Sequence, residues 1–72
     1  MIEVVTYLVR AVVETPEAVR VSERQEGGRT IYRVYVAEGE RGRVIGKKGR
    51  VIESIRTVVR AFSPGRATVE VE

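Results

Sequence analysis

The residues best suited to chemistry in this sequence are two lysines held between two glycines, in the order Gly46-Lys47-Lys48-Gly49. A Gly-x-x-Gly link turns tightly and has no Cβ atoms that would block the close approach of a ligand. The second glycine opens a predicted helix, whose first N–H groups and positive dipole end favour an anion. The pattern therefore predicts a site for phosphate groups, to which the lysines add mobile positive charge.

Positive charge is concentrated around this link. Residues 41–60 contain seven basic residues and one acidic residue, a local charge of +6. The other 52 residues contain six basic and nine acidic residues, a charge of −3. Such a division is typical of a protein that binds a polyanion. A solvated helix face is the alternative interpretation of the charge alone.

Several other kinds of chemistry are excluded. The chain has no cysteine and no histidine, so it lacks the usual zinc ligands, cysteine nucleophiles, disulfides and histidine bases. A Walker-type phosphate loop is excluded because the spacing from Gly42 to Gly46 is one residue short, and Lys48 replaces the Ser or Thr that would hold magnesium. We expect no enzyme activity, no metal and no cofactor.

The length and composition limit the fold. A chain of 72 residues is expected to form a single domain over residues 1–72, with a thin core. With 43% apolar residues it is too apolar for a disordered tail. No apolar run approaches the roughly 18 residues of a membrane span, and the N-terminus does not resemble a signal peptide. We expect a soluble, cytoplasmic domain without membrane contact.

The first half of the chain predicts a helix followed by two paired strands. Residues 2–14 place polar side chains at a 3-4-4 spacing, which indicates a helix that Pro16 ends. Residues 18–24 and 30–37 alternate as strands do, and Gly27-Gly28 between them is typical of a hairpin turn.

The second half predicts a short helical turn within residues 38–45, a helix over residues 50–62 and a strand over residues 67–71, with a break at Ser63-Pro64-Gly65. The order α-β-β-α-α-β predicts an α+β fold in which a three-stranded mixed sheet carries its helices on one face. Four aromatic residues are expected in the core or on the sheet rather than as stacking platforms for bases: Tyr7, Tyr32, Tyr35 and Phe62.

The glycine link lies within a longer pattern. The run VIGKKGRVIESI resembles the (I/V)-I-G-x-x-G-x-x-I-x-x-I signature of KH domains, and the element order resembles their type II arrangement. The length and the positions of the first helix and last strand resemble the small bacterial KH proteins of the KhpA family. Arg41 departs from this pattern, because family members often have an apolar residue there.

The resemblance implies a site and a role. In KH domains the GXXG loop clamps about four nucleotides of backbone. The implied RNA-binding residues are Arg43, Val44, Ile45, Gly46, Lys47, Lys48, Gly49 and Arg50. The family implies binding of single-stranded RNA, as an RNA chaperone or post-transcriptional regulator connected to cell-envelope growth and division. A protein-interaction module with little RNA affinity and a ribosome-assembly factor are the alternatives.

The resemblance also implies homodimers, or pairs with a larger Jag-type KH protein. The residues support this, since the 2–14 helix has a wide apolar face and the 50–62 helix carries Val58, Val59 and Phe62 near its end. We expect pairing through helical surface away from the glycine loop.

Overall fold

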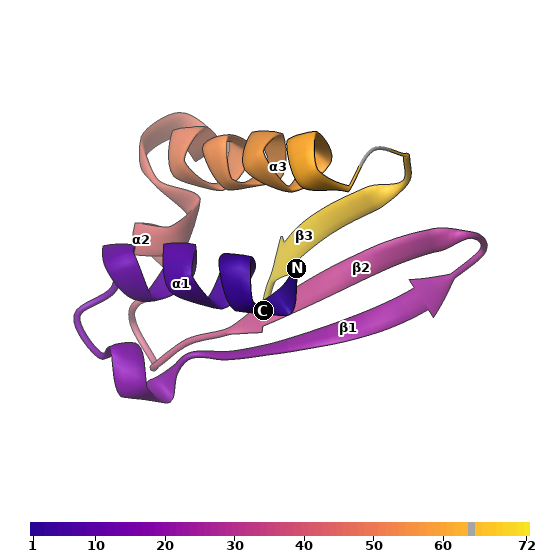
Figure 1. Ribbon diagram of the computed structural model, residues 1–72. Helices are drawn as coiled ribbons and strands as arrows, with labels where there is room; N and C mark the ends of the chain where they lie inside the picture. The colour runs from indigo at the N-terminus through magenta and orange to yellow at the C-terminus, as the bar shows by residue number, and fades with distance from the viewer. Residues whose placement is uncertain (64) are drawn as a thin grey trace.

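The computed structural model describes residues 1–63 and 65–72, and it confirms the predicted order of elements (Figure 1). Single turns of 3₁₀ helix follow the first helix and precede the last one. The elements are α1 Ile2–Val12, η1 Pro16–Ala18, β1 Arg20–Glu26, β2 Arg29–Tyr35, α2 Arg41–Ile45, η2 Lys47–Gly49, α3 Arg50–Phe62 and β3 Ala67–Val71.

The three strands form one mixed sheet in the order β1-β2-β3. β1 runs antiparallel to β2, with Arg20 opposite Tyr35, and β2 runs parallel to β3, with Tyr32 opposite Val69. Figure 1 shows α1 and α3 on the same face of the sheet. The predicted α+β fold, a three-stranded mixed sheet with helices on one face, is confirmed.

The core lies between this face of the sheet and the helices. Its buried side chains come from α1, β2, α2, α3 and β3 and from Val19 just before β1, and seven of the ten are valines. The spacing of the apolar residues in the sequence explains which side chains are buried, because every second residue of a strand and every third or fourth residue of a helix faces the same side. The buried cluster consists of Val5, Val9, Val19, Tyr32, Val34, Val44, Ile52, Ile55, Val59 and Val69.

The first helix is shorter than its apolar pattern predicts. It ends at Val12, not at residue 14, and Val13 is already extended. One feature beyond the local pattern accompanies this early end: the backbone N–H of Glu14 donates a 2.6 Å hydrogen bond to the carboxylate of Glu40, far along the chain. Pro16 then begins the separate turn η1.

The bounds of the first two strands also differ from those predicted. β1 covers Arg20–Glu26 instead of residues 18–24, and β2 covers Arg29–Tyr35 instead of residues 30–37. Strand pairing sets these limits, because Tyr35 is the last residue of β2 that has a partner on β1. The predicted Gly27-Gly28 turn joins them, and both glycines have positive φ, as a tight hairpin requires.

The third helix and the last strand have the predicted bounds. α3 ends at Phe62, and the N–H of Ser63 donates to the carbonyl of Val59. The predicted break included Pro64, which lies outside the described residues. Within residues 1–63 and 65–72, the helices are all too short to cross a membrane.

Candidate nucleic-acid interface

The loop of residues 46–49 (hereafter the 46–49 loop) joins α2 to α3 through left-handed backbone. Gly46 and Gly49 have φ values of 78° and 74°, and Lys48 has a φ of 58°. Gly46 is also required by packing, because a Cβ atom there would lie 2.7 Å from the Cβ atom and 2.8 Å from the backbone nitrogen of Val51. Close packing against α3 therefore fixes the shape of the loop.

The 46–49 loop presents positive charge at the start of a 13-residue helix. The side chains of Lys47 and Lys48 are exposed, and α3 begins directly after Gly49. In the described chain no side chain caps this helix N-terminus. The first N–H groups of a helix have no partner within it, and the helix dipole is positive there. The arrangement can bind an anion with backbone amides and two mobile ammonium groups.

A buried carboxylate anchors the start of the short helix α2. Glu40, which precedes α2, is 7% exposed and accepts the N–H of Glu14. Hydrogen bonding by the Thr15 side chain, and by the backbone N–H groups of Glu14 and Thr15, holds the pKa of Glu40 below its usual 4.5 despite burial. Arg43 of α2 forms a 2.9 Å ion pair with Glu14. These contacts attach the lead-in of the 46–49 loop to the end of α1.

A groove of about 410 Å³ lies between α2, α3 and the strand β3. Apolar side chains of Ile45, Ile52 and Val71 line it, together with the arginines Arg41 and Arg56. Two carboxylates, Glu70 on β3 and Glu72 directly after it, complete the lining. We call this hollow the α2–β3 groove. Ile45 directly precedes Gly46, so the groove begins beside the 46–49 loop.

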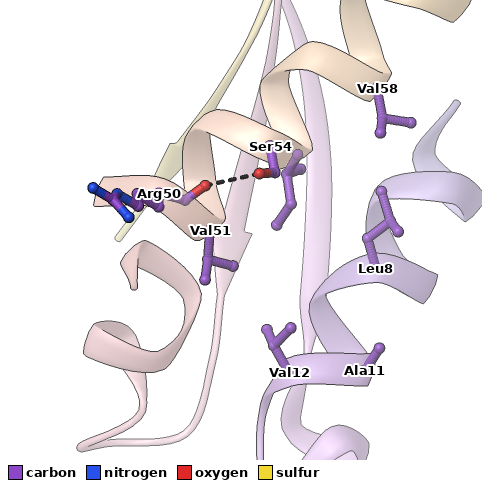
Figure 2. Close-up of a pocket in the computed structure, with 8 residues that line it drawn as sticks. Leu8, Ala11, Val12, Arg50, Val51, Ser54 and Val58 are labelled. Atoms are coloured by element: carbon purple, nitrogen blue, oxygen red, sulfur yellow. Dashed lines mark hydrogen bonds between the residues drawn. The ribbon is translucent and has the colours of Figure 1, made fainter. Parts of the chain in front are cut away.

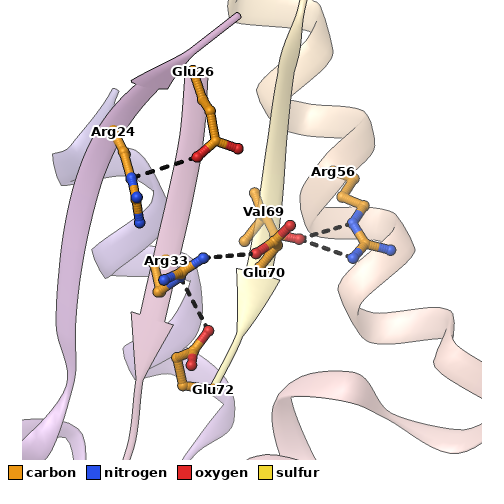
Figure 3. Close-up of polar contacts among 7 residues, drawn as sticks. All are labelled: Arg24, Glu26, Arg33, Arg56, Val69, Glu70 and Glu72. Atoms are coloured by element: carbon orange, nitrogen blue, oxygen red, sulfur yellow. Dashed lines mark hydrogen bonds and ion pairs between the residues drawn. The ribbon is translucent and has the colours of Figure 1, made fainter. Parts of the chain in front are cut away.

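Arg56 of α3 is hydrogen-bonded across the groove to the strand β3. Its Nε and Nη2 atoms donate hydrogen bonds of 3.0 Å and 2.8 Å to the backbone carbonyl of Val69 (Figure 3). Its Nη1 atom donates to Glu53 at 2.5 Å. Hydrogen bonds from three of its nitrogen atoms therefore fix the guanidinium plane, and 27% of the side chain remains exposed. A fixed guanidinium plane in a groove can stack on a nucleobase.

On the opposite face of the sheet, Arg33 of β2 pairs with both carboxylates of the groove. Its Nη2 lies 3.2 Å from Glu70 Oε1, and its Nε lies 3.1 Å from Glu72 Oε2. The hydrogen bond to Glu70 and the charge of Glu72 raise the pKa of Arg33.

A second hollow, of about 360 Å³, lies between α1 and α3 (Figure 2). We call it the α1–α3 hollow. Its lining is apolar apart from Ser54 and Arg50, and the Arg50 guanidinium points away from α1. Ser54 donates to the Arg50 carbonyl. The apolar lining consists of Leu8, Ala11, Val12, Val51, Ile55 and Val58.

The predicted site residues fall into three groups in the structure. The 46–49 loop and Ile45 lie together at one end of the α2–β3 groove. Val44 is fully buried, so it supports the loop from the core. Arg43 is turned toward Glu14, and Arg50 borders the α1–α3 hollow.

Sequence reasoning missed the far wall of the groove, formed by Arg56 and β3. It also treated Arg41 as a departure from the family pattern, whereas Arg41 lines the groove. The spacing of Ile52 and Arg56, four residues apart, places them on one helix face and was the available signal. Tyr32 is buried and Tyr35 lies on the sheet, as expected. The expectation was wrong for Tyr7 and Phe62, which are 73% and 69% exposed on helices.

Within the part of the chain that the structure describes, no group of three or more acidic, histidine or cysteine side chains could hold a metal ion.

The fold and this loop together define the class of protein. Helices joined by a Gly-x-x-Gly turn and packed on a mixed sheet in the order α-β-β-α-α-β are the type II KH arrangement. The model of one particular KH family, described as "KhpA/KhpB, KH domain", matches residues 2–71. The chain belongs to this KhpA/KhpB family of KH domains.

Curated relatives agree with this assignment. The RNA-binding protein KhpA of Chlamydia trachomatis is 42% identical over 59 residues, which cover 82% of this chain and 76% of the relative. The protein of the same name from Thermotoga maritima is 39% identical over 62 residues, covering 86% and 83%. That from Caldanaerobacter subterraneus is 41% identical over 59 residues, covering 82% and 79%. No solved structure gave a significant match.

Proposed function

We propose that this protein binds single-stranded RNA, with the phosphate backbone on the 46–49 loop and bases in the α2–β3 groove. The observation that carries the proposal is the placement of Lys47 and Lys48 at the uncapped N-terminus of α3, beside that groove. Three further exposed arginines lie within seven residues of these lysines along the chain, namely Arg41, Arg43 and Arg50. The family and the names of the relatives support RNA as the polyanion.

The shape of the groove favours single strands over duplexes. Ile45 and Ile52 supply an apolar wall for unstacked bases, and the guanidinium of Arg56 supplies a flat polar surface. A duplex keeps its bases stacked inside, so it could use the cationic loop but not the groove. The Gly46–Gly49 backbone clamp, with Arg43 and Arg50 close by along the chain, would then position the strand.

The family resemblance extends the proposal to a biological role. We propose an RNA chaperone or post-transcriptional regulator in the cytoplasm, connected to cell-envelope growth and division. RNA binding is supported by the names of the relatives, whereas this role rests on the resemblance alone. No catalytic step is part of the proposal.

A second function, protein pairing, is favoured by the α1–α3 hollow. Its lining is almost wholly apolar, and exposed Tyr7 and Phe62 add apolar surface on the same two helices. Such surface is typical of an interaction site. We propose that the chain forms a homodimer, or pairs with a larger Jag-type KH protein, through α1 and α3. Two RNA clamps on one particle would raise the avidity for longer RNA.

The test of RNA binding is the anisotropy of a fluorescent single-stranded 12-mer RNA. Lys47→Asp with Lys48→Asp changes the loop charge from +2 to −2, and we expect affinity to fall at least about tenfold. The control, Arg10→Glu with Arg60→Glu, makes the same change of charge at two exposed helix positions. Equal losses in both variants, or no loss in the loop variant, would remove the loop from the site.

Salt provides an independent measurement on the native chain. If three to four phosphates are neutralised, log K against log salt should have a slope of about −2 to −3 for a single strand. A duplex of the same sequence should bind more weakly. A flat salt response, or tighter binding of the duplex, would contradict the proposed mechanism.

A further inference from the structure

The α2–β3 groove contains two carboxylates, although its proposed ligand is an anion. Glu70 lies on β3, an edge strand of the sheet, Glu72 directly follows this strand, and both line the groove. Each side chain is 43% exposed. Like charges near a phosphate path repel the ligand, so these two residues would oppose RNA binding unless they were neutralised.

Arg33 is placed to pair with both of them and to offset one of their two negative charges. It lies opposite Glu70 in the parallel register of β2 and β3, and its guanidinium contacts Glu70 at 3.2 Å and Glu72 at 3.1 Å. Tyr32 and Val34, its neighbours on β2, face the core, so Arg33 faces the opposite side of the sheet. Figure 3 shows the Glu70 and Glu72 carboxylates directed toward β2, while Arg56 approaches β3 from α3.

We propose that Arg33 is a positioning residue for RNA binding, which offsets part of the charge of Glu70 and Glu72 and holds their carboxylates toward β2. It does so without lining the groove itself. The inference rests on the proposed RNA-binding function and deepens it. A residue on the far side of the sheet would then control the charge that the groove presents to RNA.

Loss of Arg33 would release two carboxylates at the groove. Both could then rotate toward the ligand, and their repulsion would act on the nearest phosphates. Because the side chains are partly exposed, screening limits the effect, and we expect an affinity loss of about three- to tenfold at low ionic strength. The loss should shrink as salt is added.

The experiment compares Arg33→Gln with Arg24→Gln, using the single-stranded 12-mer RNA. Arg24 is the matched control because it is an arginine of the neighbouring strand β1 that pairs with a carboxylate, Glu26, at 3.6 Å. Both variants remove one positive charge, and Glu26 does not line the groove. We expect Arg33→Gln to lose about three- to tenfold and Arg24→Gln less than about twofold. Thermal unfolding of each variant confirms that the RNA is tested on folded protein.

Removal of the carboxylates provides the reverse measurement. Glu70→Gln with Glu72→Gln leaves Arg33 with an unneutralised charge, and RNA should bind at least as tightly as to the native chain. Adding Arg33→Gln to this pair should cost little, because no carboxylate remains to be released. A merely structural role for Arg33 predicts the opposite, namely that the triple variant stays as weak as Arg33→Gln alone.

The outcomes separate this inference from the proposed function. Equal affinities of Arg33→Gln and Arg24→Gln, or no rescue in the triple variant, would overturn the role of Arg33 while RNA binding stands. A native chain that binds no single-stranded RNA at low salt would overturn both.

Discussion

The guanidinium of Arg56 in α3 donates two hydrogen bonds to one acceptor, the backbone carbonyl of Val69 in β3. β3 is an edge strand, and its outward backbone groups are available to any other strand that approaches. Arg56 occupies the middle of this edge with a side chain of its own fold. The contact therefore connects the helix that begins at the glycine loop to the strand that forms the far wall of the groove.

Replacing Arg56 by lysine tests the planar part of this contact. Lysine keeps the charge but cannot hold a flat, two-donor surface against the Val69 carbonyl. We expect a loss of about 1 kcal/mol in unfolding free energy, since the site is partly exposed. RNA affinity should fall while the salt slope stays unchanged, because phosphate contacts remain.

Urea unfolding and RNA anisotropy measure the two effects. Arg60→Lys is the matched control, because Arg60 is exposed one turn further along α3. An RNA affinity equal to that of the native chain would show that the guanidinium plane of Arg56 makes no contact with a base.

The three glycines around α2 should respond differently to alanine. Gly46 needs both a positive φ and the absence of a Cβ atom, because Val51 occupies that space. Gly46→Ala should therefore cost about 3 kcal/mol, or displace the loop, and abolish RNA binding. Gly49 has positive φ and open space, so Gly49→Ala should cost about 1 kcal/mol.

Gly42 is the internal control for this series. It lies within α2 with an ordinary φ and no atom near the Cβ position. Gly42→Ala should leave RNA binding intact and stabilise the fold by about 0.5 kcal/mol. Equal effects at all three positions would show that the backbone of the loop is freer than its packing indicates.

Acid should destabilise the fold through Glu40. Its pKa is lowered in the folded state, so its contribution to stability is complete above the unfolded pKa, near 4.5, and is lost as pH falls through the lower folded value. Glu40→Gln should be less stable than the native chain at neutral pH, and this difference should shrink below about pH 4.5.

Thermal unfolding between neutral pH and pH 3 measures this difference. Glu38→Gln, an exposed glutamate two residues earlier, is the control and should follow the native chain at every pH. If the difference in stability between the native and Glu40→Gln proteins stays constant with pH, the charge of the Glu40 carboxylate does not stabilise the contact between α1 and α2.

Pairing through the α1–α3 hollow should appear in sedimentation at micromolar concentration. We expect a species of about twice the 8.1 kDa chain mass. Val58→Asp places a charge in the hollow and should give monomers, whereas Thr57→Asp, at the exposed neighbouring position, should not. A native chain that stays monomeric would exclude the homodimer and leave a different KH protein as the partner.

Local pattern was sufficient for much of this fold. The apolar spacing of α3 and the Gly27-Gly28 turn depend on neighbours in sequence, and both were predicted correctly. The end of α1 was not predicted correctly, because it depends on the hydrogen bond between Glu14 and Glu40, which lie 26 positions apart. The limits of β1 and β2 likewise follow from pairing and not from alternation within either strand.

The candidate site divides in the same way. Motif and charge locate the 46–49 loop, since its residues are consecutive. The groove wall requires β3 to lie beside α3, and Arg33 meets Glu70 across 37 positions. Neither contact leaves a periodic trace in the sequence, so both needed the three-dimensional structure.

The left-handed backbone of Lys48 has a consequence for the evolution of stability in this chain. A non-glycine residue at a φ of 58° is strained by about 1 kcal/mol. Glycine would relax that strain and would remove one of the two ammonium groups at the tip of the loop. At this position glycine would favour thermal stability but weaken the binding of a polyanion. Selection for heat resistance alone would therefore favour a weaker binder.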